Sequence, residues 1–192
     1  MPIWKGVSNE GLPMWKAYTY KDASGNDAYV TDYEKYISTG GDAKALTETT
    51  TSDYNKAVNE FVGKSAIPDF VGGFGFDVQI KNVSISTNFS YGLGGWGYDA
   101  VYAGLMSSGS VIGTRNWHKD IRNYWSADKH TDLPILTHNV EAVKFANSTS
   151  TRFLTSRSFL TLSNARISYD LAKSLMKHLG LNSASVYVSG DN

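Results

Sequence analysis

The feature that most constrains this chain is a strict two-residue alternation of apolar and polar residues between Gly72 and Tyr91. A period of two is typical of β-strands whose two faces differ in polarity. If Lys81 and Asn82 form a two-residue turn, one register keeps all the apolar residues together. The expected pairs are Ile80 with Val83, Val78 with Ile85, Phe76 with Thr87 and Phe74 with Phe89. The segment therefore predicts a β-hairpin with one apolar face.

The opposite face of this hairpin is hydrophilic and carries Asp77, Gln79, Ser84, Ser86 and Asn88. Each arm has about the 9 to 11 residues that a tilted strand needs to cross a bilayer. An apolar face toward lipid and a polar face toward a wet lumen would describe a transmembrane β-barrel. A half-buried hairpin of a soluble β-sandwich shows the same alternation, so the pattern alone leaves both folds open.

A second strand is expected from Ser158 to Leu171, followed by a short helix and a further strand. Strict alternation gives this strand one face of Phe159, Thr161, Ala165, Ile167 and Tyr169, and a polar face of Asn164, Arg166, Ser168 and Asp170. Leu160 and Leu162 interrupt the polar face near its start. Asp170 suits the N-cap of a helix over residues 171–179, and Gly180 suits its C-terminal stop. The next strand is expected at about Ala184 to Ser189.

The rest of the chain gives weaker signals. Residues 92–157 form a long connection with one helical pattern, in which Trp117, Ile121, Tyr124 and Trp125 share a face and Thr114 is the candidate N-cap. Connections of that length are usually functional or disordered. Nearer the N-terminus, Trp15 to Tyr20 and Ala28 to Tyr33 flank a turn-rich segment and predict a hairpin. Residues 38–53 are expected to form an exposed loop.

The composition excludes several classes of protein. Eighteen Lys plus Arg balance 18 Asp plus Glu, and the cations are scattered, so no nucleic-acid surface is indicated. The sequence has no cysteine, which excludes disulfides and thiolate metal sites. No apolar run is long enough for a transmembrane helix, which leaves a transmembrane β-barrel open. No export leader follows Met1, and because the pattern is that of a barrel, we expect the chain to be part of a longer protein.

The sequence shows no catalytic or cofactor-binding motif. The histidines, His118, His130, His138 and His178, lack the spacing of metal ligands. The glycine-rich run over residues 72–75 opens a strand and not a helix, which argues against a phosphate-binding loop. No Ser-His-Asp or paired-carboxylate arrangement follows from spacing. We therefore expect no enzyme activity, no cofactor and no metal.

Four aromatic residues of the long connection are candidate substrate contacts: Trp96, Tyr98, Trp117 and Trp125. Flat aromatic rings can stack on sugars or pack against a partner protein. The alternative is that they form the small core of the connection itself. The shared helix face of Trp117 and Trp125 favours this second interpretation.

Five blocks of sequence, in order, resemble the SusC/RagA family of TonB-linked outer-membrane receptors. They are the strand entry over residues 64–75, the exit over 89–99, the two-tryptophan segment over 117–125, the strand over 150–169 and the end over 186–192. The last block departs from the family pattern only at Asp191. The resemblance covers roughly residues 11–192 and is strongest after residue 63.

The resemblance implies an all-β fold, with residues 1–192 forming the C-terminal portion of an antiparallel transmembrane β-barrel that has long extracellular loops and two short helices. Residues 92–157 would be an extracellular loop, and residues 171–180 a periplasmic connecting helix. Asp77, Gln79, Ser84, Ser86, Asn88, Asn164 and Arg166 would face the lumen.

The implied function is energy-coupled import of oligosaccharides or other large nutrients, such as peptides, across the outer membrane. A SusD-like surface lipoprotein and the TonB complex would be its partners, through other parts of a longer receptor. The alternative from composition is a soluble all-β carbohydrate-binding module.

Overall fold

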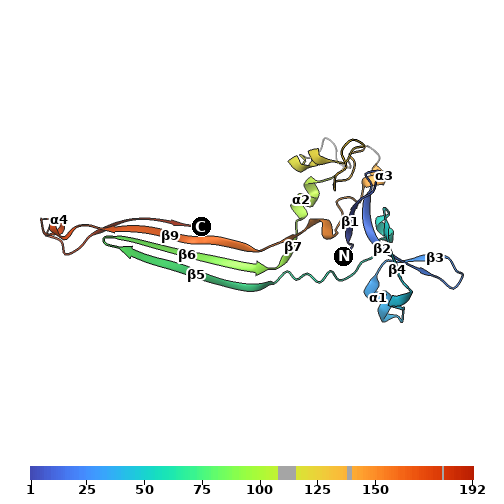
Figure 1. The fold of residues 1–192 in the computed structure, drawn as a ribbon, viewed down its shortest axis with the longest axis horizontal. Helices are drawn as coiled ribbons and strands as arrows, with labels where there is room; N and C mark the ends of the chain where they lie inside the picture. Colours follow the sequence, from blue (N-terminus) through green and yellow to red (C-terminus); the bar gives the residue numbers. More distant parts are fainter. Residues whose placement is uncertain (108–115, 138–139, 179) are drawn as a thin grey trace. The chain divides into compact units, whose positions relative to one another are not determined.

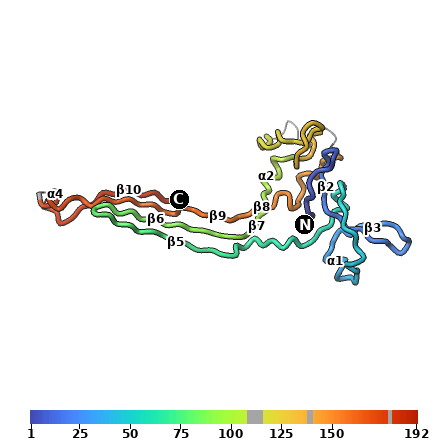
Figure 2. Tube along the Cα trace, in the orientation of Figure 1, coloured from blue at the N-terminus to red at the C-terminus, as the bar shows by residue number. Residues whose placement is uncertain are grey.

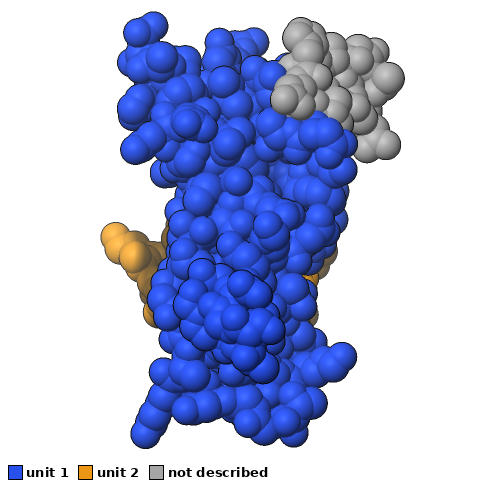
Figure 3. Space-filling model, turned by 90° about the vertical axis from the view of Figure 1, so that its right-hand side faces the viewer, with its two compact units in different colours: residues 1–64, 98–155 blue, residues 65–97, 156–192 orange. Residues whose placement is uncertain are grey.

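The computed structural model describes residues 1–107, 116–137, 140–178 and 180–192, which are mostly antiparallel β-strands with a few short helices (Figure 1). The chain divides into two compact units (Figure 3). Unit 1 contains residues 1–64 and 98–155, and unit 2 contains residues 65–97 and 156–192. His138 and Thr114 lie outside the described residues.

Unit 2 is built on a four-stranded antiparallel sheet in the order β10-β9-β6-β5 (Figure 2). Its strands are β5 (Pro68–Ile80), β6 (Val83–Gly94), β9 (Phe159–Asp170) and β10 (Ser185–Asp191). The predicted hairpin register is confirmed, since Ile80 pairs with Val83, Val78 with Ile85, Phe76 with Thr87 and Phe74 with Phe89. The turn residue Lys81 adopts a left-handed φ of 54°.

A β-bulge in β9 corrects the faces that strict alternation predicts for this strand. Asn88 pairs with Asn164, but the next residue, Phe89, pairs with Leu162, so Ser163 is the extra residue. A bulge shifts the side-chain phase by one position. Leu160 and Leu162 therefore lie on the same face as Ile167. The prediction was wrong for Phe159 and Thr161, which lie on the polar face.

Packing at the ends of β9 explains how the corrected faces are accommodated. The Phe159 ring lies over Gly92, and a Cβ atom added to this glycine would stand 2.6 Å from the ring. On the other face, Tyr91 covers Gly72 in the same way. A large aromatic side chain opposite a glycine fills the space that the glycine leaves in the sheet.

The connection from β9 to β10 contains the expected helix, but Asp170 does not cap it. Helix α4 spans Lys173–His178, whereas Asp170 is the last residue of β9 and pairs with Ser185. The prediction of Asp170 as N-cap was wrong because the helix begins later than expected, at Lys173, while Asp170 still pairs within the sheet. Gly180 has a φ of 68° just after the helix, as its role of helix stop requires. The side chain of His178 is not among the described parts.

Unit 2 receives all its connections from unit 1 at one end of the sheet. The start of β5, the end of β6 and the start of β9 meet there, because Pro68 pairs with Gly94 and Gly92 with Phe159. The other end carries the two-residue turn and the α4 connection. The short strands β7 (Trp96–Tyr98) and β8 (Leu154–Ser156), which adjoin the first end in sequence, pair with each other.

The N-terminal part of unit 1 contains a second four-stranded sheet around β2 (Pro13–Lys21). β2 pairs with β1 (Trp4–Val7), with β3 (Asp27–Val30) and, on its other edge, with β4 (Thr47–Thr51). The predicted hairpin of β2 and β3 is confirmed. The exposed loop predicted for residues 38–53 was wrong, because its threonines form β4, as suits the preference of β-branched residues for strands.

Short helices complete unit 1. They are α1 (Tyr33–Ser38), α2 (Ala100–Leu105), α3 (Val140–Val143) and the 3-10 helices η1 (Ala43–Ala45), η2 (Tyr54–Lys56), η3 (Lys119–Asn123) and η4 (Thr151–Phe153). A buried cluster of Ala103, Met106, Ile121 and Phe153 forms one core. Trp4, Trp15 and Tyr54 make edge-on ring contacts at a second place.

Residues 98–155 of the long connection and the N-terminal sheet belong to the same unit, and hydrogen bonds join them. The Trp4 amide donates to Thr151 Oγ1 at 2.9 Å, and the Thr151 amide donates to the Pro2 carbonyl at 3.0 Å. The Ile135 amide donates to the Gly11 carbonyl at 2.9 Å. Residues 98–155 therefore do not fold as an isolated loop.

Gly11 is the position of unit 1 where we expect a small substitution to be most damaging. Its φ is 79°, and a Cβ there would lie 2.7 Å from the Trp125 ring and 2.9 Å from Ile135. Gly11→Ala should lower the free energy of unfolding by about 3 kcal/mol, through backbone strain and overpacking. The measurement is guanidinium unfolding of the detergent-solubilised protein followed by Trp fluorescence.

Gly25→Ala is the matched control for this prediction. Gly25 has nearly the same φ, 80°, but nothing lies within 4 Å of its added Cβ. Only the strain of about 1 kcal/mol should remain. Equal effects of the two substitutions would contradict the close packing of Gly11 against Trp125.

Candidate functional site

The unit 2 sheet has one face that is apolar in successive cross-strand rows. Directly paired residues point to the same side of a sheet. Val78, Ile85, Ile167 and Val188 form one such row across all four strands, and they are 49%, 39%, 56% and 76% exposed. Phe74, Phe89 and Leu162 form another, in which the two phenyl rings stack at 5.0 Å. Soluble monomers rarely expose an apolar surface this continuous.

The other face of the sheet is polar in the rows between. All seven residues that were predicted to share a hydrophilic surface lie on it: Asp77, Gln79, Ser84, Ser86, Asn88, Asn164 and Arg166. Side chains on this face contact one another across strands. Asn164 Nδ2 donates to Asp191 Oδ1 at 2.5 Å, and the hydroxyls of Ser90 and Ser163 lie 2.9 Å apart. The sheet is thus two-sided from the turn at Lys81 to the row of Ser90, and beyond that row the polar face carries the apolar residues Val71 and Phe159.

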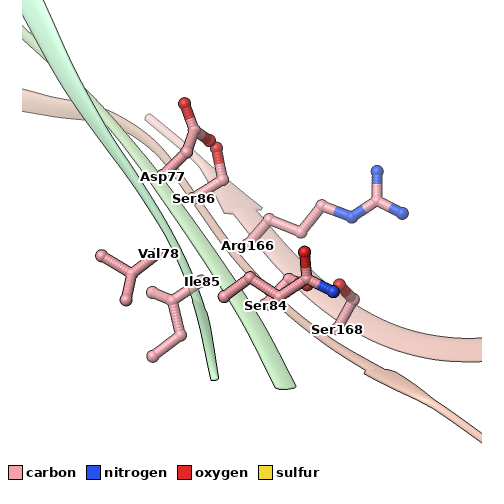
Figure 4. A pocket seen from close by; sticks show the side chains of 8 residues that line it. Asp77, Val78, Ser84, Ile85, Ser86, Arg166 and Ser168 are labelled. Atoms are coloured by element: carbon pink, nitrogen blue, oxygen red, sulfur yellow. The ribbon is translucent and has the colours of Figure 1, made fainter. Parts of the chain in front are cut away.

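A hollow of about 370 Å³ lies on this polar face. Two cross-strand rows supply its polar residues, one with Asp77, Ser86 and Arg166 and the other with Gln79, Ser84 and Ser168. The Arg166 guanidinium carbon lies 4.0 Å from the centre of the Tyr187 ring. Figure 4 shows Ser86 beside Asp77, with the guanidinium of Arg166 extending away from both.

The four candidate aromatic residues do not form one continuous platform. Trp96 belongs to unit 2, and its amide donates to the Ser65 carbonyl at 2.7 Å. Tyr98 and Trp117 pack against the buried cluster of unit 1. The Trp125 ring stacks on His130 at 5.3 Å and lies against the backbone of Gly11. Trp125 is therefore held by contacts within its own chain.

The helix predicted around Trp117 and Trp125 is shorter than expected. Only residues 119–123 are helical, as the 3-10 helix η3. Tyr124 leaves the helix with a ψ of 157°, and the Trp125 amide donates to the Leu133 carbonyl at 3.1 Å. The shared helix face was wrong because this extended contact to residue 133 replaces the last helical turn.

Sequence reasoning missed Arg152, which is a half-buried cation of unit 1. Its guanidinium lies 4.8 Å from the centres of both the Trp4 and the Phe153 rings, and Nη1 donates to the Ala146 carbonyl at 2.5 Å. Burial lowers the pKa of Arg152 to about 10, so it stays charged at neutral pH. No spacing in the sequence marks this contact, because the Trp4 ring comes from a distant segment.

A second polar contact links α2 to η3. The Tyr102 hydroxyl donates to Asp120 Oδ2 at 3.0 Å, and His118 Nδ1 lies 3.2 Å from the same oxygen. Burial, and then the bond to Asp120, raise the pKa of the Tyr102 hydroxyl above its usual value. The group positions the connection and offers no reactive arrangement.

The described part of the chain contains neither a metal-binding cluster nor a membrane-spanning helix. No group of three or more His, Cys, Asp or Glu residues there is placed to hold a metal ion. Within the same residues, no helix has both the length and the apolar character to cross a membrane.

Comparison with known proteins gives relatives of one kind, although no family model matches the sequence. TonB-dependent receptor P3 of Formosa agariphila is 32% identical over 126 residues, which are 65% of this chain and 12% of that receptor. A structure of the RagAB peptide importer in its closed-closed state matches the whole chain with a TM-score of 0.62 and 27% identity. The open-open state gives 0.57 and 24%. This chain spans 18% of each solved chain.

Proposed function

We propose that the unit 2 sheet is a stretch of the barrel wall of an outer-membrane importer. The premise is that this chain belongs to the SusC/RagA-type TonB-dependent receptors. The observation that carries the proposal is the two-sided sheet, with apolar rows on one face and polar rows on the other. A wall between lipid and a wet lumen needs this arrangement. Strands of 12 and 13 residues are long enough to cross a bilayer at a tilt.

In this proposal the row of Val78, Ile85, Ile167 and Val188 meets lipid. The polar face meets the lumen, with Asp77, Gln79, Ser84, Ser86, Asn88, Asn164 and Arg166 lining it. The alternative, a soluble carbohydrate-binding module, would need a second layer over the apolar face. The exposure of that face within the described residues argues against it.

The ends of the sheet then have different surroundings. Large excursions belong on the extracellular side of such barrels and short turns on the periplasmic side. Residues 92–157 would form part of the extracellular mouth, in which residues 98–155 pack with the N-terminal sheet. Residues 171–180 would form a periplasmic connection. A SusD-like lipoprotein and TonB would act with the whole receptor.

The substrates proposed are large nutrients, oligosaccharides or peptides. The solved relatives are described as a peptide importer, which supports peptides. Trp96, Tyr98, Trp117 and Trp125 remain the proposed aromatic contacts of the mouth. Among them, Tyr98 and Trp117 also stabilise the unit 1 core, so their substitution would affect folding as well as binding.

Site-directed labelling tests the proposed sidedness, and residues 1–192 contribute no cysteine other than the one introduced. Cysteine is placed at Val78 or Ile85 on one face and at Gln79 or Ser84 on the other, in the native protein in outer membranes. Fluorophores on the first pair should be quenched by nitroxide lipids. The second pair should react instead with a water-soluble maleimide. Lipid quenching at both pairs, or at neither, would contradict the proposal that this sheet is a stretch of the barrel wall.

A further inference from the structure

All the lysines of unit 2 lie at the end of the sheet that carries the two-residue turn and the α4 connection (Figure 1). Lys81 is in the turn, and Lys173 and Lys177 belong to α4. All three residues are exposed, and none forms an ion pair within the part of the chain that the structure describes. Asp170 is the one acidic residue of this end, so the lysines give it a net positive charge.

The apolar face of the sheet continues up to these lysines. Its last cross-strand row contains Ile80, Val83, Tyr169 and Val186, and all four residues are exposed. Lys81 follows Ile80 directly, so their Cα atoms are about 3.8 Å apart. Tyrosine is enriched in membrane proteins at the level where hydrocarbon meets the lipid headgroups. The change from apolar residues to lysine therefore coincides with the expected boundary of the hydrocarbon layer.

Helix α4 has two different sides. Lys173 and Lys177 are four residues apart and share one side, whereas Leu175 lies about 200° around the axis from Lys173. Leu175 is exposed, and so is Leu181, whose amide donates to the Met176 carbonyl at 3.1 Å. This bond holds Leu181 next to the helix. Lysines on one side and exposed leucines on the other are typical of helices that lie in the interface of a bilayer.

The opposite end of the sheet lacks this arrangement. Its charged residues within unit 2 are Asp69 and Arg157, one of each sign. A lysine close to an anionic lipid surface strengthens attraction to it by a factor of about five. The end with the turn is therefore the one where an anionic headgroup is favoured.

We propose that this end of unit 2 binds the phosphate groups of anionic phospholipids in the periplasmic leaflet of the outer membrane. Lys81, Lys173 and Lys177 contact the phosphates, which their flexible stems allow them to reach from apolar surroundings. Leu175 and Leu181 enter the acyl-chain region beside the last apolar row. The proposal rests on the proposed function, because the apolar face must meet lipid before its end can meet headgroups.

Fluorescence quenching by lipids with different headgroups tests this inference. The full-length receptor carries bimane on the introduced cysteine of Leu181→Cys, in phosphatidylcholine vesicles with a small fraction of nitroxide-labelled lipid. Labelled phosphatidylglycerol should reach half-maximal quenching at a mole fraction at least about fivefold lower than labelled phosphatidylcholine. Changing Lys81, Lys173 and Lys177 together to glutamine should remove this preference, whereas changing them to arginine should preserve it.

The matched control removes the same charge elsewhere. Lys35, Lys44 and Lys119 are exposed lysines of unit 1, and changing all three to glutamine should leave the preference unchanged. Equal quenching by the two lipids at Leu181→Cys, no quenching there, or a preference that survives the glutamine substitutions in unit 2 would overturn the lipid site.

Bimane at Val78→Cys separates this failure from failure of the proposed wall. Both labelled lipids should quench it, because Val78 lies on the apolar face. Quenching at Val78→Cys without the preference at Leu181→Cys would reject the lipid site and leave the wall standing. Absence of quenching at Val78→Cys would contradict the wall, and the lipid site with it.

Discussion

Arginine in place of Val78 or Ile85 should cost about 2 to 4 kcal/mol of folding free energy in a lipid bilayer. These residues are paired on the apolar face and are 49% and 39% exposed. In a wall they would contact hydrocarbon, where a guanidinium loses its hydration without gaining a partner. The measurement is guanidinium unfolding of the native protein in lipid vesicles, followed by Trp fluorescence.

The controls for this experiment lie one residue away on the same strands. Gln79→Arg and Ser86→Arg place the same side chain on the polar face, where Arg166 already stands in the Ser86 row. The folding free energy that these two substitutions cost should be small, because the lumen contains water. Equal damage from both pairs would mean that the two faces do not differ in their surroundings, and the proposed wall would be wrong.

The hairpin was predictable in detail because the alternation has a period of two and is uninterrupted over both arms. Any shift of one residue would expose Val78, Ile85 and their neighbours on the polar face, so a single register satisfies the pattern. The two-residue turn at Lys81 and Asn82 independently sets the same register. The pairing in β5 and β6 follows from these two constraints together.

Other features depended on contacts between distant segments. Arg152 is enclosed by Trp4 and Phe153, and one of these rings is far away in sequence. The helical pattern around Trp117 gave way to a backbone bond between Trp125 and Leu133. In the same way, Thr47–Thr51 became a strand because β2 offered an open edge. Local patterns do not contain this information.

The bulge at Ser163 is an intermediate case, because the sequence held its signal. Leu160 and Leu162 interrupted the predicted polar face of β9, and a shift of phase restores both to the apolar face. An unbroken strand would place Leu162 opposite Ser90 and Leu160 opposite Gly92, both on the polar face. The two leucines therefore mark the position where the alternation of side chains along β9 shifts by one residue.

Leu162→Arg should accordingly be severe and Thr161→Arg mild, which is the opposite of what unbroken alternation predicts. Leu162 shares a row with Phe74 and Phe89, whereas Thr161 pairs with Ser90 on the polar face. The Phe74 row and the Val78 row lie on opposite sides of the Phe76 row, each two residues away from it. For strands tilted by about 45°, both rows therefore differ from the Phe76 row by about 5 Å in their depth in the bilayer. We therefore expect Leu162→Arg to cost about as much as Val78→Arg, about 2 to 4 kcal/mol.

Deleting Ser163 provides the internal control for this last prediction. Without the extra residue, Asn164 and Leu162 remain opposite Asn88 and Phe89, and the ladder becomes regular with every side chain on its present face. The deletion should therefore be tolerated in the vesicle unfolding assay, apart from the loss of the hydroxyl contact with Ser90. If Thr161→Arg proved severe and Leu162→Arg mild, β9 would have to run without the bulge, and its polar face, including the place of Arg166 beside Ser86, would need to be reassigned.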